Sequence, residues 1–234
     1  MKDNFIHVCF ILDESGSMGG SVNDVIGGFT KTLEDQKSIE NGQCSVSLYK
    51  FNNTVHKIFV GKDISKVEPL KRGSIGSEWD RCVYNPGGCT AMYDGIGTAI
   101  KEIGEWLSEM PESERPSKNL IVIMTDGEEN ASSEYTAQKV KDMIKEQETK
   151  YSWTFVYMGT DITTTEGADA LGLKYQVYST RACHSGNFNI VSEVASQYRT
   201  HVDAVSAFAN TLDRSIDAAN RKYEAETGNK ITKD

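Results

Sequence analysis

Two near-continuous apolar runs, each ending at an acidic residue, constrain the fold of this chain most. Residues 5–12 read FIHVCFIL and stop at Asp13, and residues 119–125 read NLIVIMT and stop at Asp126. Runs without polar alternation are typical of central strands in a parallel sheet that is covered on both faces. The first run is too short to span a bilayer, and no convincing signal-peptide cleavage site follows it. We therefore expect no membrane span and a layered fold.

Strand and helix patterns alternate along the rest of the chain. Apolar residues recur at helical spacing over about 22–33, 92–107 and 134–147. Further strand patterns cover about 44–51, 54–60, 151–158 and 174–178. The pair Asn52-Asn53 favours a tight hairpin, which makes the third strand an antiparallel edge. The pattern predicts an α/β fold: a doubly wound, mostly parallel, six-stranded Rossmann-like sheet with one antiparallel edge strand and helices on both faces.

The C-terminal part of the chain has a helical pattern of its own. No proline follows Pro116, and an apolar stripe runs at helical spacing from Ile190 to Ile216, which predicts more than one helix. The simplest interpretation is that the stripe covers the sheet, and the alternative is that its later helix packs against a partner. We expect one domain over residues 1–200 and a C-terminal helical extension with a polar tail over residues 201–234.

Charge and cysteine content limit the partners and the compartment. The chain has 34 Asp and Glu against 25 Lys and Arg, a formal net charge of −9, and no local basic patch. Such a chain repels phosphate backbones, so we expect no nucleic-acid partner. Its five cysteines are an odd number and form no CxxC pair, which favours reduced thiols and a cytoplasmic localisation.

The two acidic strand ends indicate a cation site. If the first strand neighbours the fourth, Asp13 and Asp126 face each other beyond the carboxyl edge of the sheet, where α/β folds bind ligands. Two facing carboxylates repel each other unless a cation or a proton lies between them. Hydroxyl oxygens of Ser15, Ser17 and Thr90 are hard neutral donors that suit Mg²⁺.

These residues resemble a known site. Asp13-x-Ser15-x-Ser17, then Thr90, then Asp126 within Thr-Asp-Gly are similar to the metal-ion-dependent adhesion site (MIDAS) of a von Willebrand factor A-type (vWA) domain. The resemblance covers about residues 4–200. It implies that Asp13, Ser15 and Ser17 bind Mg²⁺, with Mn²⁺ or Ca²⁺ as substitutes, that Thr90 binds directly or through water, and that Asp126 binds mostly through water. It also implies that a Glu or Asp of a partner protein completes the coordination.

The resemblance implies a function without catalysis. We expect a Mg²⁺-dependent protein-binding module, for adhesion or as a scaffold, with no catalytic residue. It is similar to stand-alone intracellular vWA proteins of bacteria and phages, which implies a multiprotein complex or an AAA-type ATPase as partner. One alternative is a structural protein whose metal only staples loops. A less favoured one is a Mg²⁺-dependent phosphohydrolase, but its chemistry needs an acid where Ser15 stands.

Acidic residues concentrate at the expected strand ends. Four loop segments, which we call the rim, together hold ten Asp and Glu and no Lys or Arg: 13–24, 85–94, 125–134 and 159–166. The pattern therefore predicts a cation-binding rim. Beyond the predicted ligands, loop acids are usually solvated, and we expect this or a partner contact for Glu14, Glu128, Glu129 and Asp161. The four dispersed histidines are expected in core or surface positions.

Overall fold

A single mixed sheet forms the centre of the molecule. The computed structural model describes residues 1–73, 80, 82–159, 165–179, 184–200 and 204–231. Six strands lie in the order β3-β2-β1-β6-β7-β8, and β3 runs antiparallel to β2 while the other pairs are parallel. The strands are β1 (Lys2–Asp13), β2 (Gln43–Phe51), β3 (Val55–Asp63), β6 (Pro116–Thr125), β7 (Thr154–Gly159) and β8 (Tyr175–Tyr178). The predicted fold class, including the antiparallel edge strand, is confirmed.

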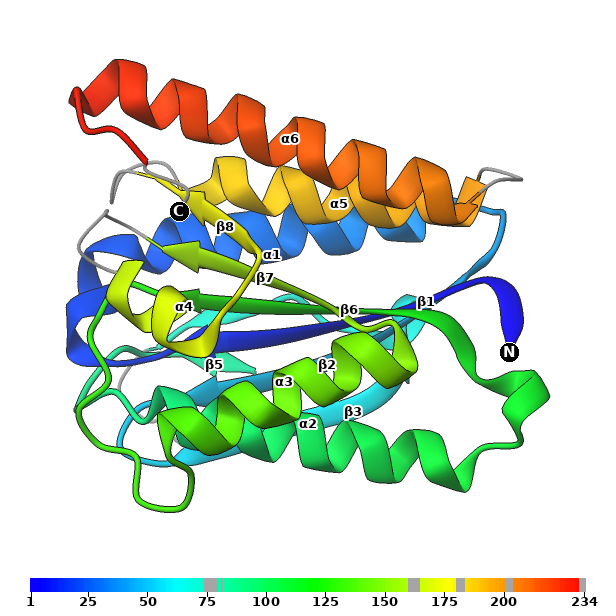
Figure 1. Cartoon of the computed structure of the whole chain (residues 1–234), viewed down its shortest axis with the longest axis horizontal. Coiled ribbons are helices and arrows are strands. Elements are labelled where there is room, and N and C mark those ends of the chain that lie inside the picture. Colours follow the sequence, from blue (N-terminus) through cyan, green and yellow to red (C-terminus); the bar gives the residue numbers. More distant parts are fainter. Residues whose placement is uncertain (74–79, 81, 160–164, 180–183, 201–203, 232–234) are drawn as a thin grey trace.

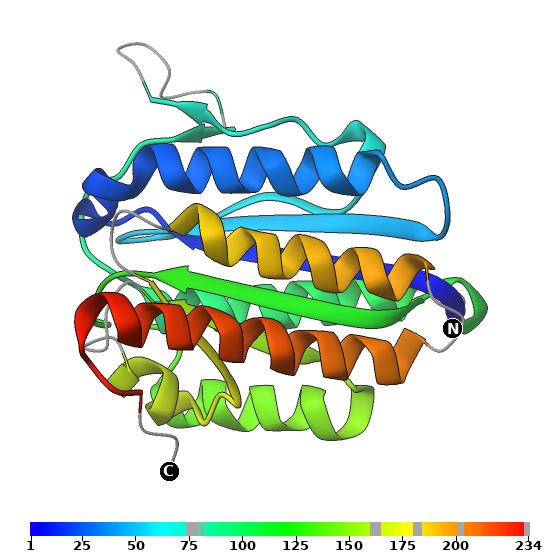
Figure 2. The same cartoon turned by 90° about the horizontal axis from the view of Figure 1, so that it is seen from above.

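Helices cover both faces of the sheet (Figures 1 and 2). One face carries α1 (Val22–Lys37), α5 (His184–Thr200) and α6 (Ala204–Thr227), and the other carries α2 (Met92–Glu109), α3 (Ala137–Tyr151) and α4 (Thr165–Leu171). Successive residues of β1 point to opposite faces of the sheet. Val8 and Phe10 lie in the core under α1 and α5. Cys9 and Ile11 lie in the core under α2 and α3. Burial on both sides explains why β1 shows no polar alternation.

Short helices and a small second sheet lie outside the main sheet and its helices. The turns η1 (Gly16–Ser21), η2 (Ile64–Lys66) and η3 (Glu112–Glu114) are 3-10 helices, and β4 (Lys71–Arg72) pairs in parallel with β5 (Val83–Tyr84). Sequence patterning predicts no strand for either of these two short segments. No helix within the described part of the chain is long and apolar enough to cross a membrane.

The third main helix begins later than its sequence pattern predicts. It is expected over 134–147, but α3 starts at Ala137, with Thr136 accepting a hydrogen bond from the Lys139 N–H at 3.3 Å as its N-cap. The N–H groups of residues 133–135 instead bind the carboxylate of Asp94 at 2.8–2.9 Å. A tertiary contact therefore holds these residues outside the helix.

The C-terminal stripe forms two helices that pack inside the molecule. Phe208, Leu212 and Ile216 of α6 are buried in the same core as Val191 and Val194 of α5. The helices lie side by side over the sheet (Figure 2). The later helix thus covers the sheet in this structure, while the division of the chain at residue 200 stays a prediction.

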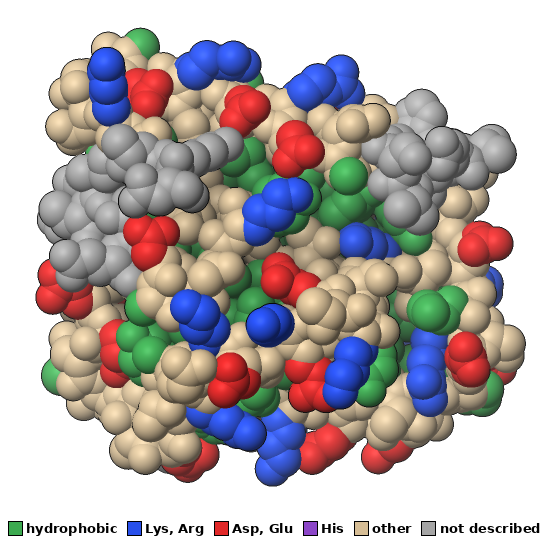
Figure 3. All heavy atoms as spheres, viewed as in Figure 1, with side chains coloured by type: hydrophobic (Ala, Val, Ile, Leu, Met, Phe, Trp, Pro, Cys, Tyr) green, Lys and Arg blue, Asp and Glu red, His purple; other side chains and the backbone are tan. Residues whose placement is uncertain are grey.

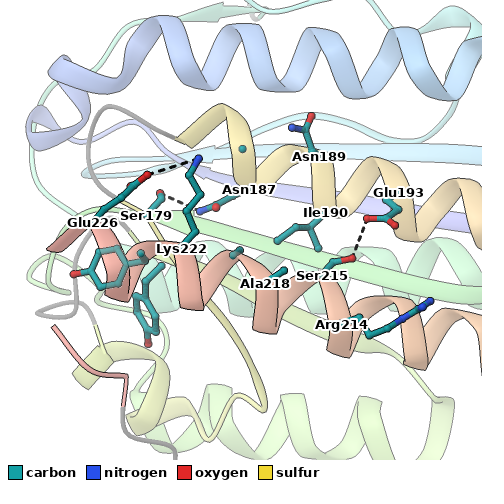
Figure 4. A pocket seen from close by; sticks show the side chains of 14 residues that line it. Ser179, Asn187, Asn189, Ile190, Glu193, Arg214, Ser215, Ala218, Lys222 and Glu226 are labelled. Atoms are coloured by element: carbon teal, nitrogen blue, oxygen red, sulfur yellow. Dashed lines mark hydrogen bonds and ion pairs between the residues drawn. The ribbon is translucent and has the colours of Figure 1, made fainter. Parts of the chain in front are cut away.

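A groove of about 590 Å³ lies between α5, α6 and the end of β8 (Figure 4). Polar side chains lining it pair with one another. Ser215 Oγ donates to Glu193 Oε2 at 2.9 Å, and Asn187 Nδ2 donates to Ser179 Oγ at 3.1 Å. These pairs join the helices to each other and to the strand end, and none of the five predicted metal ligands lines the groove.

Asn220 of α6 completes the outer edge of β8. Its Oδ1 accepts from the Tyr178 N–H at 3.1 Å, and its Nδ2 donates to the Gln176 carbonyl at 2.9 Å. A further strand would bind such backbone groups at the edge of a sheet. The buried Asn220 side chain thus binds the backbone groups of Gln176 and Tyr178 that a further strand would otherwise bind.

We expect Asn220→Ala to lower the free energy of unfolding by about 1–3 kcal/mol, because it leaves two backbone groups of β8 without their partner. Urea unfolding measures the change. Asn210→Ala, at an exposed position of the same helix, is the matched control and should change stability by less than about 0.5 kcal/mol. Equal effects of the two substitutions would contradict the role given to Asn220.

His7 is a buried, neutral histidine between two serines. Its Nδ1 lies 2.9 Å from Ser45 Oγ and its Nε2 lies 3.1 Å from Ser47 Oγ, and its ring lies 4.8 Å from the Trp106 ring. Hydroxyls donate or accept, so the pair suits an imidazole with one donor and one acceptor nitrogen. Burial lowers the pKa of His7 from 6.5 to about 3. The structure places His7 in the core, one of the two positions expected for the histidines.

This histidine should make the fold sensitive to acid. The unfolded chain binds a proton at His7 below about pH 6.5 and the folded chain does not, so stability falls as the pH drops below that value. Between pH 6.5 and 5, the wild type should lose about 2 kcal/mol more than His7→Gln in urea unfolding. His56→Gln, at an exposed position of β3, is the control for replacing a histidine by glutamine. Parallel pH curves for wild type and His7→Gln would refute the assignment.

Candidate metal site

The pairing of β1 with β6 brings the two acidic strand ends together. Leu12 lies beside Met124 in the parallel ladder, so Asp13 at the end of β1 and Thr125 at the end of β6 leave the sheet at the same edge. The arrowheads of the two strands point to this edge in Figure 1. The expected neighbourhood of the first and fourth main strands is thus present.

Asp13 is fully buried and is held through both carboxylate oxygens. Its Oδ1 accepts from the Ser15 N–H at 2.7 Å, and its Oδ2 accepts from Thr125 Oγ1 at 2.6 Å. Burial raises the pKa of the Asp13 carboxyl from 3.8 to about 6; the charge of Asp126 adds to the rise, and the hydrogen bonds from Thr125 and Ser15 oppose it. A bound cation favours the charged form that burial and the second carboxylate disfavour.

A chain of oxygens links the first loop to Asp126. Ser15 Oγ lies 3.0 Å from Ser17 Oγ, and Ser17 Oγ donates to Asp126 Oδ1. Ser15 and Asp126 are buried, whereas Ser17 is exposed. The oxygens therefore form a connected set that reaches solvent at Ser17.

Thr90 faces the same point from a third loop. A Cβ built on Gly127 would lie 3.3 Å from both Ser17 Oγ and Thr90 Oγ1, so the missing side chain at this glycine leaves a small cradle between the two hydroxyls. All five residues predicted from the sequence thus gather at one edge of the sheet. Two carboxylates and three hydroxyls around a cradle are a hard, all-oxygen donor set, which fits Mg²⁺ or a similar divalent cation.

Thr125 is a member of this set that sequence reasoning does not assign. Its hydroxyl donates to Asp13 Oδ2 and also lies 3.3 Å from the Gly127 N–H, which donates to it. Its signal is its place within the Thr-Asp-Gly segment, but the sequence does not show that its hydroxyl points at Asp13. No cluster of three or more His, Cys, Asp or Glu side chains that could hold a metal occurs among the described residues, so this site depends on two carboxylates together with hydroxyl oxygens.

Glu14 is expected to be solvated or to contact a partner, and this prediction is wrong. Its carboxylate forms a buried ion pair with Lys50. Its Oε1 accepts from Lys50 Nζ at 2.9 Å and from the Asn85 N–H at 2.7 Å, and both side chains of the pair are only 7% exposed. Lys50 also donates to the Val83 carbonyl, and Tyr84 donates to the Asp13 carbonyl. The pair therefore anchors the segment that leads to Thr90 against the end of β1.

Other rim acids also bind protein groups. The Glu129 carboxylate accepts from the N–H groups of Tyr93, Ala131 and Ser132 at 2.7–3.0 Å, so its predicted solvated or partner-contacting role is wrong. Glu128 is exposed, as predicted, and Asp161 lies outside the described residues. The acid count of the rim thus overstates its cation site, because Glu14 and Glu129 serve as internal acceptors.

A sequence model of a known family covers most of the chain. The model of the von Willebrand factor type A domain matches residues 7–174. The chain belongs to this family. The matched part contains all five predicted ligands of the vWA domain and ends just before β8, so α5 and α6 lie beyond it.

One curated relative is a much longer protein. The chain is 31% identical over 131 residues to calcium-activated chloride channel regulator 4 of Homo sapiens. This alignment covers 54% of the chain and 12% of the human protein. The likeness is thus confined to a small part of that relative.

Solved vWA structures share the fold at low identity. The vWF domain of the type V pili tip protein Mfa5 from Porphyromonas gingivalis has a TM-score of 0.61 and 10% identity, covering 86% of this chain and 98% of its own. Proximal thread matrix protein 1 from the mussel byssus, with a zinc-occupied MIDAS motif, has a TM-score of 0.54 and 17% identity, covering 83% of this chain and 47% of its own. The PilB minor pilin from Streptococcus sanguinis has a TM-score of 0.57 and 15% identity, with 85% and 63% covered.

The buried ion pair beside the site should be costly to break. Lys50→Met leaves the Glu14 carboxylate buried without a counter-charge, and we expect a loss of about 3–5 kcal/mol in the free energy of unfolding. The double variant Lys50→Met with Glu14→Gln should recover part of this loss in urea unfolding.

The matched control is the half-exposed pair of Lys57 and Glu102, 2.8 Å apart. Lys57→Met should cost less than about 1 kcal/mol, because water screens exposed ion pairs. A similar cost for Lys50→Met and Lys57→Met would contradict the buried role of Lys50.

Proposed function

We propose that this vWA chain is a divalent-cation-dependent protein-binding module. In this proposal Mg²⁺ is held by Asp13, Ser15, Ser17, Thr90 and Asp126, and a Glu or Asp of a partner protein supplies a further ligand. The observation that carries the proposal is the convergence of two carboxylates and three hydroxyls on one cradle beside Gly127. Mn²⁺ and Ca²⁺ are proposed as substitutes, since both accept oxygen ligands.

The charge of the donor set favours a carboxylate ligand from outside. Asp13 and Asp126 contribute two negative charges, and the hydroxyls of Ser15, Ser17 and Thr90 contribute none. A divalent ion bound there acts as a Lewis acid whose charge is only just balanced, so it retains affinity for one more anion. Exposure of Ser17 and Gly16 leaves the site open on the side from which a partner approaches.

Protein contacts already hold the loops, which argues against a metal that only staples them. The Glu14–Lys50 pair fixes the segment before Thr90, and Glu129 fixes the loop after Asp126. Backbone bonds add to this, with the Gly16 N–H donating to the Gly88 carbonyl at 3.1 Å. We infer that a cation adds binding capacity to loops that are ordered by other means.

A phosphohydrolase is less well supported. Its acid–base step needs a carboxyl where Ser15 stands, and Ser15 Oγ instead pairs with Ser17 Oγ. Lys50 lies near the end of β1, but its ammonium binds Glu14 and the Val83 carbonyl. We therefore propose a module without catalytic activity, and Mg²⁺-dependent turnover of a generic phosphate ester would refute this.

The surface charge bears on the kind of partner that the module binds. A multiprotein complex or an AAA-type ATPase in the cytoplasm stays a prediction, as does the absence of a nucleic-acid partner. On the face seen in Figure 3, acidic and basic side chains are interspersed, and neither sign gathers into one large patch. This distribution favours a local contact centred on the cation over a broad electrostatic interface.

Asp13→Asn should separate binding from folding. The amide removes a buried charge beside Asp126, so we expect a melting temperature in EDTA at pH 7.5 that is equal to or above that of the wild type. Mg²⁺ should raise the melting temperature of the wild type but not of the variant. Isothermal titration with Mg²⁺ should show binding only for the wild type. Loss of folding in the variant would favour the loop-staple alternative.

Peptide selection tests the partner chemistry. Random peptides selected on the wild type in Mg²⁺ should be enriched in Asp or Glu and should be released by EDTA. Asp126→Ala should not retain them, whereas Asp24→Ala, at a half-buried position of α1, should. Retention of the same peptides in EDTA would contradict a metal-bridged carboxylate.

A further inference from the structure

We infer that Asn130 is a positioning residue that sets the place of Thr90 relative to Asp126. The inference deepens the proposed metal site and rests on it. Asn130 Oδ1 accepts from the Thr90 N–H at 2.9 Å, and the Thr90 carbonyl accepts from the N–H groups of Asn130 and Ala131 at 3.0 and 3.2 Å. Both backbone polar groups of Thr90 are thus bound by the loop that begins at Asp126, so the two ligand-bearing loops move together.

The start of α2 explains why this arrangement is needed. Its N-cap position is Ala91, which has no side chain able to accept from the first N–H groups of the helix. The Tyr93 N–H donates to Glu129 Oε2 at 3.0 Å, and the Asp94 N–H donates to Ser132 Oγ at 3.1 Å. The loop after β6 therefore caps α2 from outside the helix.

The capping is reciprocal. Asp94 in the first turn of α2 accepts from the N–H groups of Ser133, Glu134 and Tyr135 at 2.8–2.9 Å and is only 7% exposed. The capping loop is thus held by the helix that it caps. These reciprocal hydrogen bonds hold the backbone on both sides of Thr90. The Thr90 hydroxyl does not cap α2 and instead faces Ser17 across the cradle at Gly127.

Among the residues that make these contacts, Asn130 is the one that we expect to affect metal binding. Asp94 and Glu129 hold α2 and the loop, but the side chain that reaches Thr90 itself is that of Asn130. Residues that orient metal ligands commonly contribute a factor of 10–100 to metal affinity. We expect Asn130 to act in this way, through Thr90 and without touching the cation.

The test is a double-variant cycle on Mg²⁺ affinity, measured by isothermal titration with the metal alone. Asn130→Ala should weaken Mg²⁺ binding about tenfold or more. Thr90→Val removes the hydroxyl, and in that background Asn130→Ala should cause no further loss. Asn130→Asp keeps the acceptor oxygen and should bind Mg²⁺ at least as well as the wild type. If the alanine variant does not fold, Asn130→Ser replaces it. The serine side chain is too short to reach the Thr90 N–H, which lies 2.9 Å from Asn130 Oδ1 in the wild type.

Asn220→Ala is the control for lost stability alone, because it breaks a comparable side-chain clamp on β8, outside the metal site. It should lower the melting temperature and leave Mg²⁺ affinity unchanged. The inference is overturned if Asn130→Ala binds Mg²⁺ as the wild type does, or if its effect is the same with and without the Thr90 hydroxyl. A wild type that binds neither Mg²⁺ nor Mn²⁺ overturns the proposed function itself, and the two failures are thus distinguishable.

Discussion

The parallel pairing of β1 with β6 is the constraint on which the rest of this structure depends. It buries both strands under helices on either face and brings Asp13 beside Thr125 and Asp126 at one edge. Two aspartates at neighbouring strand ends create a local excess of negative charge that the fold alone does not neutralise. Burial raises the pKa of Asp13 to about 6, the charge of Asp126 adds to this rise, and the hydrogen bonds from Thr125 and Ser15 oppose it only in part. A cation at this edge would favour the charged form of both carboxylates, which is why we place the proposed metal there.

The same edge shows that acids serve two different purposes. Asp13 and Asp126 face each other's charge, whereas Glu14, Asp94 and Glu129 accept hydrogen bonds from Lys50 or from backbone N–H groups. A count of charges along the sequence does not separate these purposes. The structure separates them by their donors. Glu14 binds the Lys50 ammonium, and Asp94 and Glu129 each accept from three backbone N–H groups. Asp126 instead accepts from the Ser17 hydroxyl, and Asp13 lies close enough to Asp126 for the two charges to repel. These contacts hold the loops that carry Ser17 and Thr90 to the rest of the protein.

The sequence predicts the fold and the site to the extent that local signals determine them. Apolar runs identify β1 and β6, and the hairpin residues Asn52 and Asn53 identify the antiparallel edge. The order of Asp13, Thr90 and Asp126 along strand ends predicts the residues of the proposed metal site, which lie at one edge of the sheet in the structure. What the sequence does not reveal is the contacts that side chains make with distant parts of the chain, such as Lys50 with the Glu14 carboxylate or Asn130 with the Thr90 N–H. The start of α3 is misjudged for the same reason, since Asp94 binds residues that would otherwise join the helix.

The charge of Asp13 lowers the stability of the fold but suits the proposed metal, whereas Glu14, Asp94 and Glu129 stabilise the fold. A rise in the pKa of a buried carboxyl from 3.8 to about 6 means that the charged form costs about 3 kcal/mol at neutral pH relative to the unfolded chain. A bound cation would favour the charged form, so relief of this cost would contribute to the proposed metal affinity. The anchors at Glu14, Asp94 and Glu129 supply the compensating stability without facing the cation. Because these two sets of residues are distinct, we expect a substitution in the first set to change metal affinity and a substitution in the second set to change the order of the loops. Asn130 is the residue through which the second set acts on the first.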